Sequence, residues 1–128
     1  MDAELYARLA ASAGIAALCG SAIYALTSPK EAVGSFVVWQ RISGAPAEGA
    51  LDEENNIMAA RVQIDSYADS YGGARALGDA VRATLLNWRG TGAKVADCRL
   101  ENDRAIRETD PALKTFRVSQ DFIVTFYQ

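Results

Sequence analysis

Alternating apolar and polar residues mark two strands in the middle of the chain. Residues 35–42 are rich in β-branched and aromatic side chains, which favours an extended backbone. In residues 57–68, apolar side chains occupy every second position from Met58 to Ile64, as expected for a strand with one buried face. The two segments together predict an antiparallel hairpin.

A helical period replaces this alternation after residue 68. One apolar face recurs at spacings of four, four and three residues, and it consists of Leu77, Val81, Leu85 and Trp88. Asp69 and Ser70 offer an N-cap, so the predicted helix runs from about residue 70 to Trp88. Arg75 and Asp79 lie on its opposite side, four residues apart, which predicts an ion pair between them.

The N-terminal part is predicted to be a helix followed by a short strand. Residues 2–13 form the helix, which we expect to end at Gly14, and residues 15–18 form a further short turn. The apolar run 22–26 predicts the strand. Acidic residues at positions 2 and 4 stand where an export signal has basic ones, which argues against a signal peptide.

Two further strands complete the chain. Residues 94–106 predict a strand with an irregularity near 101–103, and residues 116–127 alternate with Gln120 as the polar exception on the apolar face. We therefore expect a single α+β domain over residues 1–128. Its antiparallel or mixed β-sheet has four to five strands, with an N-terminal helix and one central amphipathic helix packed on one face. The expected core contains Leu77, Val81, Leu85, Val62, Ile64, Val118, Phe122 and Val124.

A long polar connection, residues 43–56, separates the two strands of the hairpin. A hairpin needs about two to five residues for its turn, so a segment of this length indicates a function. It carries the acidic run Asp52-Glu53-Glu54. A solvated charge run and an acidic patch that faces a partner are the two interpretations of this run.

Composition excludes several kinds of chemistry. The 128 residues include no histidine, which removes Ser-His-Asp and Cys-His catalysis and every histidine metal ligand. A net charge of −3 argues against non-specific nucleic-acid binding. Glycine and serine residues interrupt the most apolar stretch, residues 9–26, too often for a membrane helix.

The remaining candidates for chemistry have ordinary structural explanations. Tyr71-Gly72-Gly73 lacks both common phosphate-loop patterns, so we expect no cofactor there. Cys19 and Cys98 fit no zinc spacing, and we expect unpaired buried thiols, with a redox pair as the alternative. Four carboxylates on the strands would act as an acid–base pair only if they converged and were buried. They are Asp65, Asp97, Glu101 and Asp121.

Three arginines lie on the predicted strands, at positions where the alternation points them away from the apolar face. They are Arg41, Arg61 and Arg117. An outer sheet face of this kind is solvated in a monomer, whereas in an assembly this face, or the strand edges beside it, is where neighbouring subunits dock.

Four segments read together resemble a known family. They are Val38–Ser43 (VWQRIS), Ala60–Ala68 (ARVQIDSYA), Ala74–Arg82 (ARALGDAVR) and Phe116–Val124 (FRVSQDFIV). Their order resembles that of the tail completion, or tail terminator, proteins of long-tailed bacteriophages, prophages and gene transfer particles. The resemblance covers nearly the whole chain.

The resemblance implies a structural virion protein at the head-proximal end of the tail, assembled in the host cytoplasm. Family members form a hexameric ring that ends the tail tube and joins it to the head connector, and DNA passes through without specific binding. The implied partners are further copies of this chain, the tail tube protein and the head–tail connector or stopper protein; no enzyme activity, cofactor, metal or membrane is implied. We expect the contacts with neighbouring subunits or rings at Asp52, Glu53, Glu54, Arg41 and Arg61. For the long connection, lining of the channel and an idle solvated loop are the alternatives. A head-side connector subunit, a small ligand-binding α+β module and an enzyme using carboxylates are the alternatives.

Overall fold

The computed structural model describes residues 2–25, 34–46, 57–86, 88, 95–107 and 116–127. Within these ranges the chain forms three helices and five strands. In chain order they are α1 (Asp2–Ala10), α2 (Ala13–Cys19), β1 (Ile23–Ala25), β2 (Phe36–Pro46), β3 (Ile57–Ala68), α3 (Tyr71–Leu86), β4 (Val95–Arg107) and β5 (Phe116–Tyr127).

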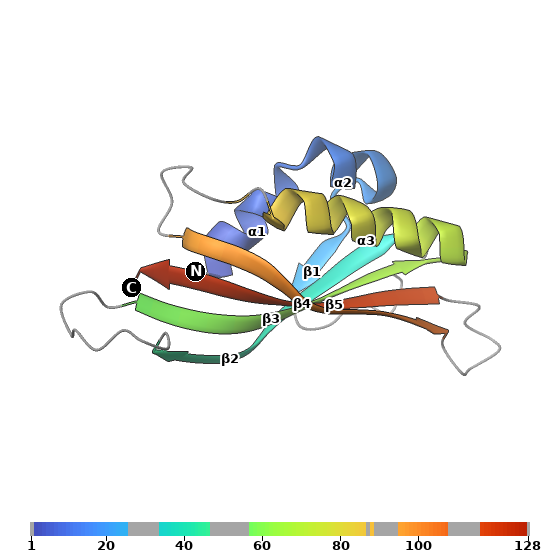
Figure 1. Cartoon of the computed structure of the whole chain (residues 1–128). Helices are drawn as coiled ribbons and strands as arrows, with labels where there is room; N and C mark the ends of the chain where they lie inside the picture. The colour runs from blue at the N-terminus through green and yellow to red at the C-terminus, as the bar shows by residue number, and fades with distance from the viewer. Residues whose placement is uncertain are drawn as a thin grey trace.

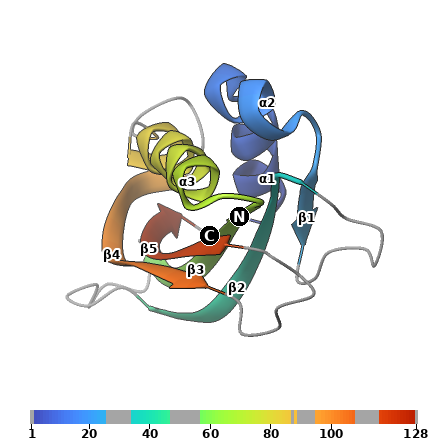
Figure 2. The same cartoon turned by 90° about the vertical axis from the view of Figure 1, so that its right-hand side faces the viewer.

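The five strands form one mixed sheet in the order β1-β2-β3-β5-β4. The short β1 runs parallel to β2, and all the other neighbours are antiparallel. All three helices lie on one face of the curved sheet, and the opposite face carries none of them (Figures 1 and 2). The predicted α+β class, the hairpin and the one-sided helix packing are therefore confirmed.

Strand β2 is longer than the sequence predicted. It extends to Pro46, which pairs with Met58 of β3, after a register shift between Arg41 and Ser43. The prediction of a connection from residue 43 was wrong because strand pairing uses backbone groups, so glycine and alanine can continue it. Pro46 lacks an N–H group, but no described strand lies along the outer edge of β2 at this point. The rest of the expected connection, residues 47–56, lies outside the described residues.

The N-terminal helix is divided in two, at a different place from the one predicted. The chain leaves α1 after Ala10, and Ser12 caps α2 by accepting a hydrogen bond from the N–H of Ile15 at 3.2 Å. Gly14 therefore lies inside α2 and does not end a helix. The residue that does end α2 is Gly20, whose φ of 62° is a conformation that suits glycine.

The core lies between α3 and the helix-facing side of the sheet. All eight residues expected there are fully buried: Leu77, Val81, Leu85, Val62, Ile64, Val118, Phe122 and Val124. From the other helices, α1 contributes Leu5 and Leu9 to the same core, and α2 contributes Ile15. Burial of these side chains is the main favourable contribution to folding.

Helix α3 approaches strand β5 closely at Gly78. A Cβ atom on this residue would lie 2.9 Å from Cγ1 of Val118, closer than two carbon atoms pack. The absence of a side chain also leaves the carbonyl of Gly78 accessible, and Nε2 of Gln120 donates a hydrogen bond to it at 3.1 Å. This contact explains why a polar residue occupies the apolar face of β5.

Gln120 also belongs to a polar network that joins α3 to β4. Its Nε2 donates to Oδ2 of Asp103 at 3.0 Å, and the Arg75 guanidinium donates to Oδ1 of the same carboxylate at 2.9 Å. The partner of Arg75 is thus Asp103, and the predicted pair with Asp79 was wrong. A contact across the helix–sheet interface takes precedence because β4 places a carboxylate within reach of the guanidinium. The predicted irregularity near 101–103 is confirmed as a register shift between Leu100 and Asn102.

The network shifts the ionisation of both charged members. Partial burial tends to raise the pKa of Asp103, but the hydrogen bonds from Gln120 and Arg75 outweigh this, and the pKa lies below its ordinary value of 3.8. The hydrogen bond to Asp103 raises the pKa of Arg75. The ionised pair is therefore the form that the fold favours.

Substitution Gly78→Ala is expected to lower the free energy of unfolding by about 1–2 kcal/mol, because overpacking against Val118 outweighs the helix propensity of alanine. Denaturant unfolding measures the effect. In a Val118→Ala background the same substitution should cost less, because the methyl groups that it meets are gone. Gly72→Ala is the matched control: its added Cβ meets nothing within 4 Å, so equal destabilisation by both would contradict the close approach.

Substitution Asp103→Asn is expected to destabilise the protein by about 1–3 kcal/mol at pH 7, because it removes the charge from the hydrogen bonds with Arg75 and Gln120. The folded-state pKa of Asp103 is lowered, so the carboxylate stabilises the fold above pH 3.8 and this stabilisation is lost as the pH falls through the folded-state pKa. Unfolding at pH 7 and at low pH should thus show the two proteins converging in acid. Asp79→Asn is the control. If it lowered the free energy of unfolding as much as Asp103→Asn does, the result would support a pair between Arg75 and Asp79 instead.

Candidate interaction surfaces

The described part of the chain offers no metal centre. No three cysteine, aspartate or glutamate side chains within it gather as ligands. Cys19 and Cys98 are free, as predicted; Cys98 is buried, but Cys19 is only partly buried, so the prediction of burial was wrong for Cys19. Burial, with a smaller contribution from Asp97, raises the pKa of the Cys98 thiol to about 12, and burial also raises the pKa of Cys19, so neither is an activated nucleophile.

Two further sequence features have structural explanations. At the start of α3, Oγ of Ser70 accepts a hydrogen bond from the N–H of Gly73 at 3.1 Å, which is an ordinary helix cap. In the described ranges, no helix combines the length and apolar character that crossing a membrane requires.

The strand carboxylates do not form an acid–base pair, because arginines lie beside them. On the sheet face opposite the helices, the Arg117 guanidinium is 3.8 Å from Asp65, and that of Arg61 is 3.6 Å from Asp121. Arg61 also lies 3.7 Å from Glu101. The arrangement neutralises the carboxylates and leaves none positioned to exchange protons with another.

This outer face is more buried than an uncovered sheet face usually is. Asp65 and Asp121 are only 6% and 7% exposed, although no helix covers them. Long arginine side chains can lie along a surface and cover it while the charged group stays in water. Next to these ion pairs, the rings of Phe36 and Tyr67 stack with their centroids 4.6 Å apart. The outer face is thus a mixed layer of arginines, carboxylates and aromatic rings.

The residues predicted to contact neighbouring subunits lie in different places. Arg61 belongs to the outer face, as expected. Arg41 does not: it pairs in register with Val62, whose side chain faces the helices, so its predicted orientation was wrong. The register from Val37 through Trp39 to Arg41 is unbroken, so Arg41 shares the face of these two buried side chains, whereas the prediction had assigned it to the opposite face. Asp52, Glu53 and Glu54 lie outside the described residues.

A hollow of about 330 Å³ lies next to Arg41 in the C-terminal half of β2. Its apolar lining comes from Ile42, Met58 and Phe126. Ile42 lies within the register shift and is 49% exposed. A large aliphatic side chain is thus presented to solvent at this end of the sheet.

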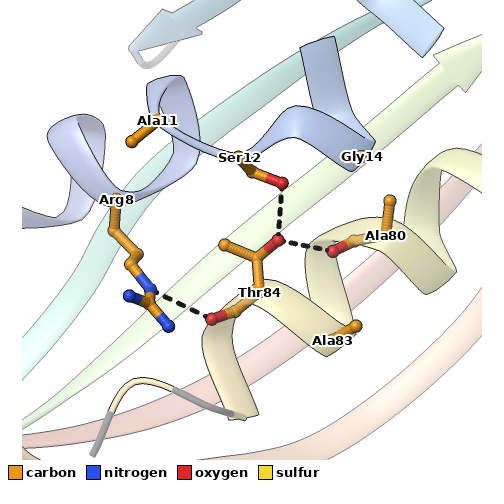
Figure 3. A pocket seen from close by; sticks show the side chains of 7 residues that line it. All are labelled: Arg8, Ala11, Ser12, Gly14, Ala80, Ala83 and Thr84. Carbon is orange, nitrogen blue, oxygen red and sulfur yellow. Dashed lines mark hydrogen bonds between the residues drawn. The ribbon is translucent and has the colours of Figure 1, made fainter. Parts of the chain in front are cut away.

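A second hollow, of about 430 Å³, lies between the α1–α2 corner and α3 (Figure 3). We call it the helical groove; it is lined by Arg8, Ala11, Ser12, Gly14, Ala80, Ala83 and Thr84. Most of these residues are small, so the walls are shallow. Hydrogen bonds across the groove hold α1 and α2 against α3.

Hydrogen bonds within the helical groove use its hydroxyl groups. The Thr84 hydroxyl donates to the carbonyl of Ala80 at 2.8 Å, and it also bonds to the Ser12 hydroxyl at 2.9 Å (Figure 3). Because the Thr84 hydroxyl has one proton, Ser12 supplies the proton of the second bond. Nε of Arg8 donates to the carbonyl of Thr84 at 3.2 Å. The two hydroxyl groups of the groove are therefore already paired with each other, and the guanidinium of Arg8 is part of its lining.

Sequence reasoning missed the helical groove. The signal available to it was the run of alanine and glycine between residues 7 and 17, in which Arg8 is the one charged residue. Taken alone, that run describes a helix of high propensity. The run becomes one wall of a groove only because α3, more than sixty residues further along the chain, forms the other wall.

Comparison with known proteins identifies the family. The family of the tail completion protein gp17 matches residues 3–127. This chain belongs to that family. As a tail completion protein it is a structural component of the virion and not an enzyme.

A solved structure shares the fold of this tail completion protein. A chain from the "Virion of native gene transfer agent (GTA) particle" aligns with a TM-score of 0.74 and 21% sequence identity, over 97% of this chain and 92% of that one. A second solved chain aligns over 100% of this chain and 99% of its own length, with a TM-score of 0.48 and 14% identity. No curated protein matches the sequence.

Proposed function

We propose that this protein forms a hexameric ring that ends the tail tube at its head-proximal end and joins it to the head connector. The observation that carries the proposal is the family match over residues 3–127. The similarity in fold to a chain of a gene transfer agent virion supports it. In this proposal residues 1–128 act as a single domain, and the partners are other copies of the chain, the tail tube protein and the connector or stopper protein.

The charge of the chain is compatible with the passage of DNA through such a ring. The net charge is −3, and the arginines of the outer face lie beside carboxylates. Affinity for duplex DNA comes largely from Lys and Arg contacts that displace counterions from the phosphates. A subunit with neutralised arginines and an acidic balance lets the duplex move without holding it.

The hairpin of β2 and β3 supports a contact with the neighbouring ring. Its strands have 11 and 12 residues. The end of β2 and the start of β3 lie at the same end of the sheet as the end of β5 (Figure 1). The segment between them carries Asp52, Glu53 and Glu54. We place the contact with the tube or the connector at these acids, with Arg41 and Arg61 on the adjoining strands.

Imaging of particles tests the proposed function directly. The expected result is one layer of this protein, in several copies around the channel, between the tail tube and the head. Particles made without the protein should separate into unattached heads and tails. A single copy, or normal joining in its absence, would contradict the proposal, and a layer on the head side of the joint would assign it to the connector.

Replacement of residues 48–56 by the turn Asn-Gly is expected to leave the fold intact and to reduce head–tail joining. The two strands retain their pairing because Asn-Gly closes a tight hairpin, whereas the acidic contact is lost. Thermal unfolding measures the first effect, and the yield of joined particles measures the second. A matched variant that keeps the segment but changes Asp52, Glu53 and Glu54 to the corresponding amides separates charge from length, and normal yields from both would show the segment to be idle.

A further inference from the structure

The buried apolar side chains form a large and a small cluster, and two polar side chains lie between them. Along β3, Ser66 stands between Ile64 of the large cluster and Ala68 of the small one. Along β5, Gln120 separates the same two clusters. Both polar residues are fully buried. We call Ser66 and Gln120 the polar pair.

The members of the polar pair are neighbours on the helix-facing side of the sheet. In the register of β3 with β5, Ser66 lies opposite Val118 and Gln120 lies opposite Ile64. The two are therefore diagonal neighbours, and residues in this relation are about 7–8 Å apart. A serine and a glutamine side chain cover part of this distance, so a single small molecule can bridge their polar atoms.

The amide of Gln120 is fixed in orientation by its two N–H groups. Nε2 donates to the carbonyl of Gly78 at 3.1 Å and to Oδ2 of Asp103 at 3.0 Å. Exchange of the nitrogen and the oxygen would place the oxygen against two acceptors, so the amide does not turn over. Asp103 belongs to β4, whereas β3 lies on the other side of β5. The amide oxygen is thus directed away from β4, towards the side on which β3 carries Ser66.

Both members of the polar pair have a buried atom that needs a hydrogen bond. Oε1 of Gln120 and Oγ of Ser66 are inaccessible to solvent and have no partner among the described residues. Proteins pair almost all buried polar atoms, and they commonly use an internal water for those that no protein group reaches. An amide oxygen accepts and a hydroxyl group both donates and accepts, which is the set of partners that a water molecule requires.

Helix α3 leaves space above the polar pair. Its buried residues at this place are Ala74, which packs in the small cluster, and Gly78, which lies over Val118 and Gln120. The larger buried side chains of α3, from Leu77 onwards, pack in the large cluster instead. The interface is therefore poorest in side-chain volume where the two unpaired atoms lie.

We propose that Ser66 and Gln120 bind one internal water molecule. The water donates a hydrogen bond to Oε1 of Gln120 and forms a second one with the hydroxyl of Ser66. It extends the polar network of Gln120 to β3, so that hydrogen bonds join β3, β5, β4 and α3 through one amide. The inference concerns the folded subunit and does not depend on the proposed function.

A crystal structure of the protein at a resolution that shows ordered waters tests the site. The expected result is one buried water within hydrogen-bond distance of both Oγ of Ser66 and Oε1 of Gln120. A direct hydrogen bond between the two side chains would overturn the inference. A hydroxyl of Ser66 that donates to a backbone carbonyl, with no water beside it, would overturn it as well.

A double-mutant cycle tests the same site in solution. Ser66→Ala and Gln120→Met each remove one partner of the water, so the midpoint of denaturant unfolding should shift less on the second substitution than on the first. The loss of the Gln120 bonds to Gly78 and Asp103 occurs in both arms of the cycle and cancels. Additive shifts would overturn the inference, and if Gln120→Met does not fold, the crystal structure decides alone.

Ser119→Ala is the matched control for this cycle. Ser119 is also a buried strand serine, but it lies on the opposite face of the sheet and accepts a hydrogen bond from Nε2 of Gln63 at 3.3 Å. Its effect should add to that of Gln120→Met. Coupling as large in the control as in the test pair would show that the non-additivity does not come from a shared water, and would overturn the inference.

Discussion

The close approach of α3 to β5 at Gly78 fixes the positions of the other elements. A helix with an ordinary side chain at this position would be held away from Val118, and Gln120 would not reach the Gly78 carbonyl. The contact brings Arg75 within reach of Asp103 and thereby ties α3 to β4. The apolar face of α3 supplies the attraction, and the glycine and the buried amide determine how the helix is placed.

The helical layer depends on this placement in turn. Helices α1 and α2 pack on α3 through hydrogen bonds from Arg8 and Ser12 to Thr84, which lies less than two turns beyond Gly78. A shift of α3 would move Thr84 and open or close the helical groove. The groove is therefore a product of the core, even though it is not part of it.

The two faces of the protein use opposite physical strategies. The outer sheet face contains arginines and carboxylates that neutralise each other, and it is covered by its own long side chains. The exposed positions of α1 and α2 from Tyr6 to Leu18 are uncharged, whereas α3 exposes Asp79 and Arg82. In the proposed ring, the outer face is the one that would not bind the phosphates of DNA, because its arginines lie beside carboxylates.

The sequence by itself determined the elements whose signal is local. The alternation in residues 57–68 and 116–127 and the helical period through Leu77, Val81 and Leu85 identified the sheet, the central helix and the core, because periodicity depends only on neighbouring residues. The same segments carried the resemblance to the tail completion family. Contacts between distant residues decided the rest. Arg75 pairs with Asp103 and not with Asp79 because β4 is brought beside α3, and Arg41 faces the helix side because β2 pairs it with Val62 of β3. The helical groove requires residues from three helices, and no local pattern specifies how those helices meet.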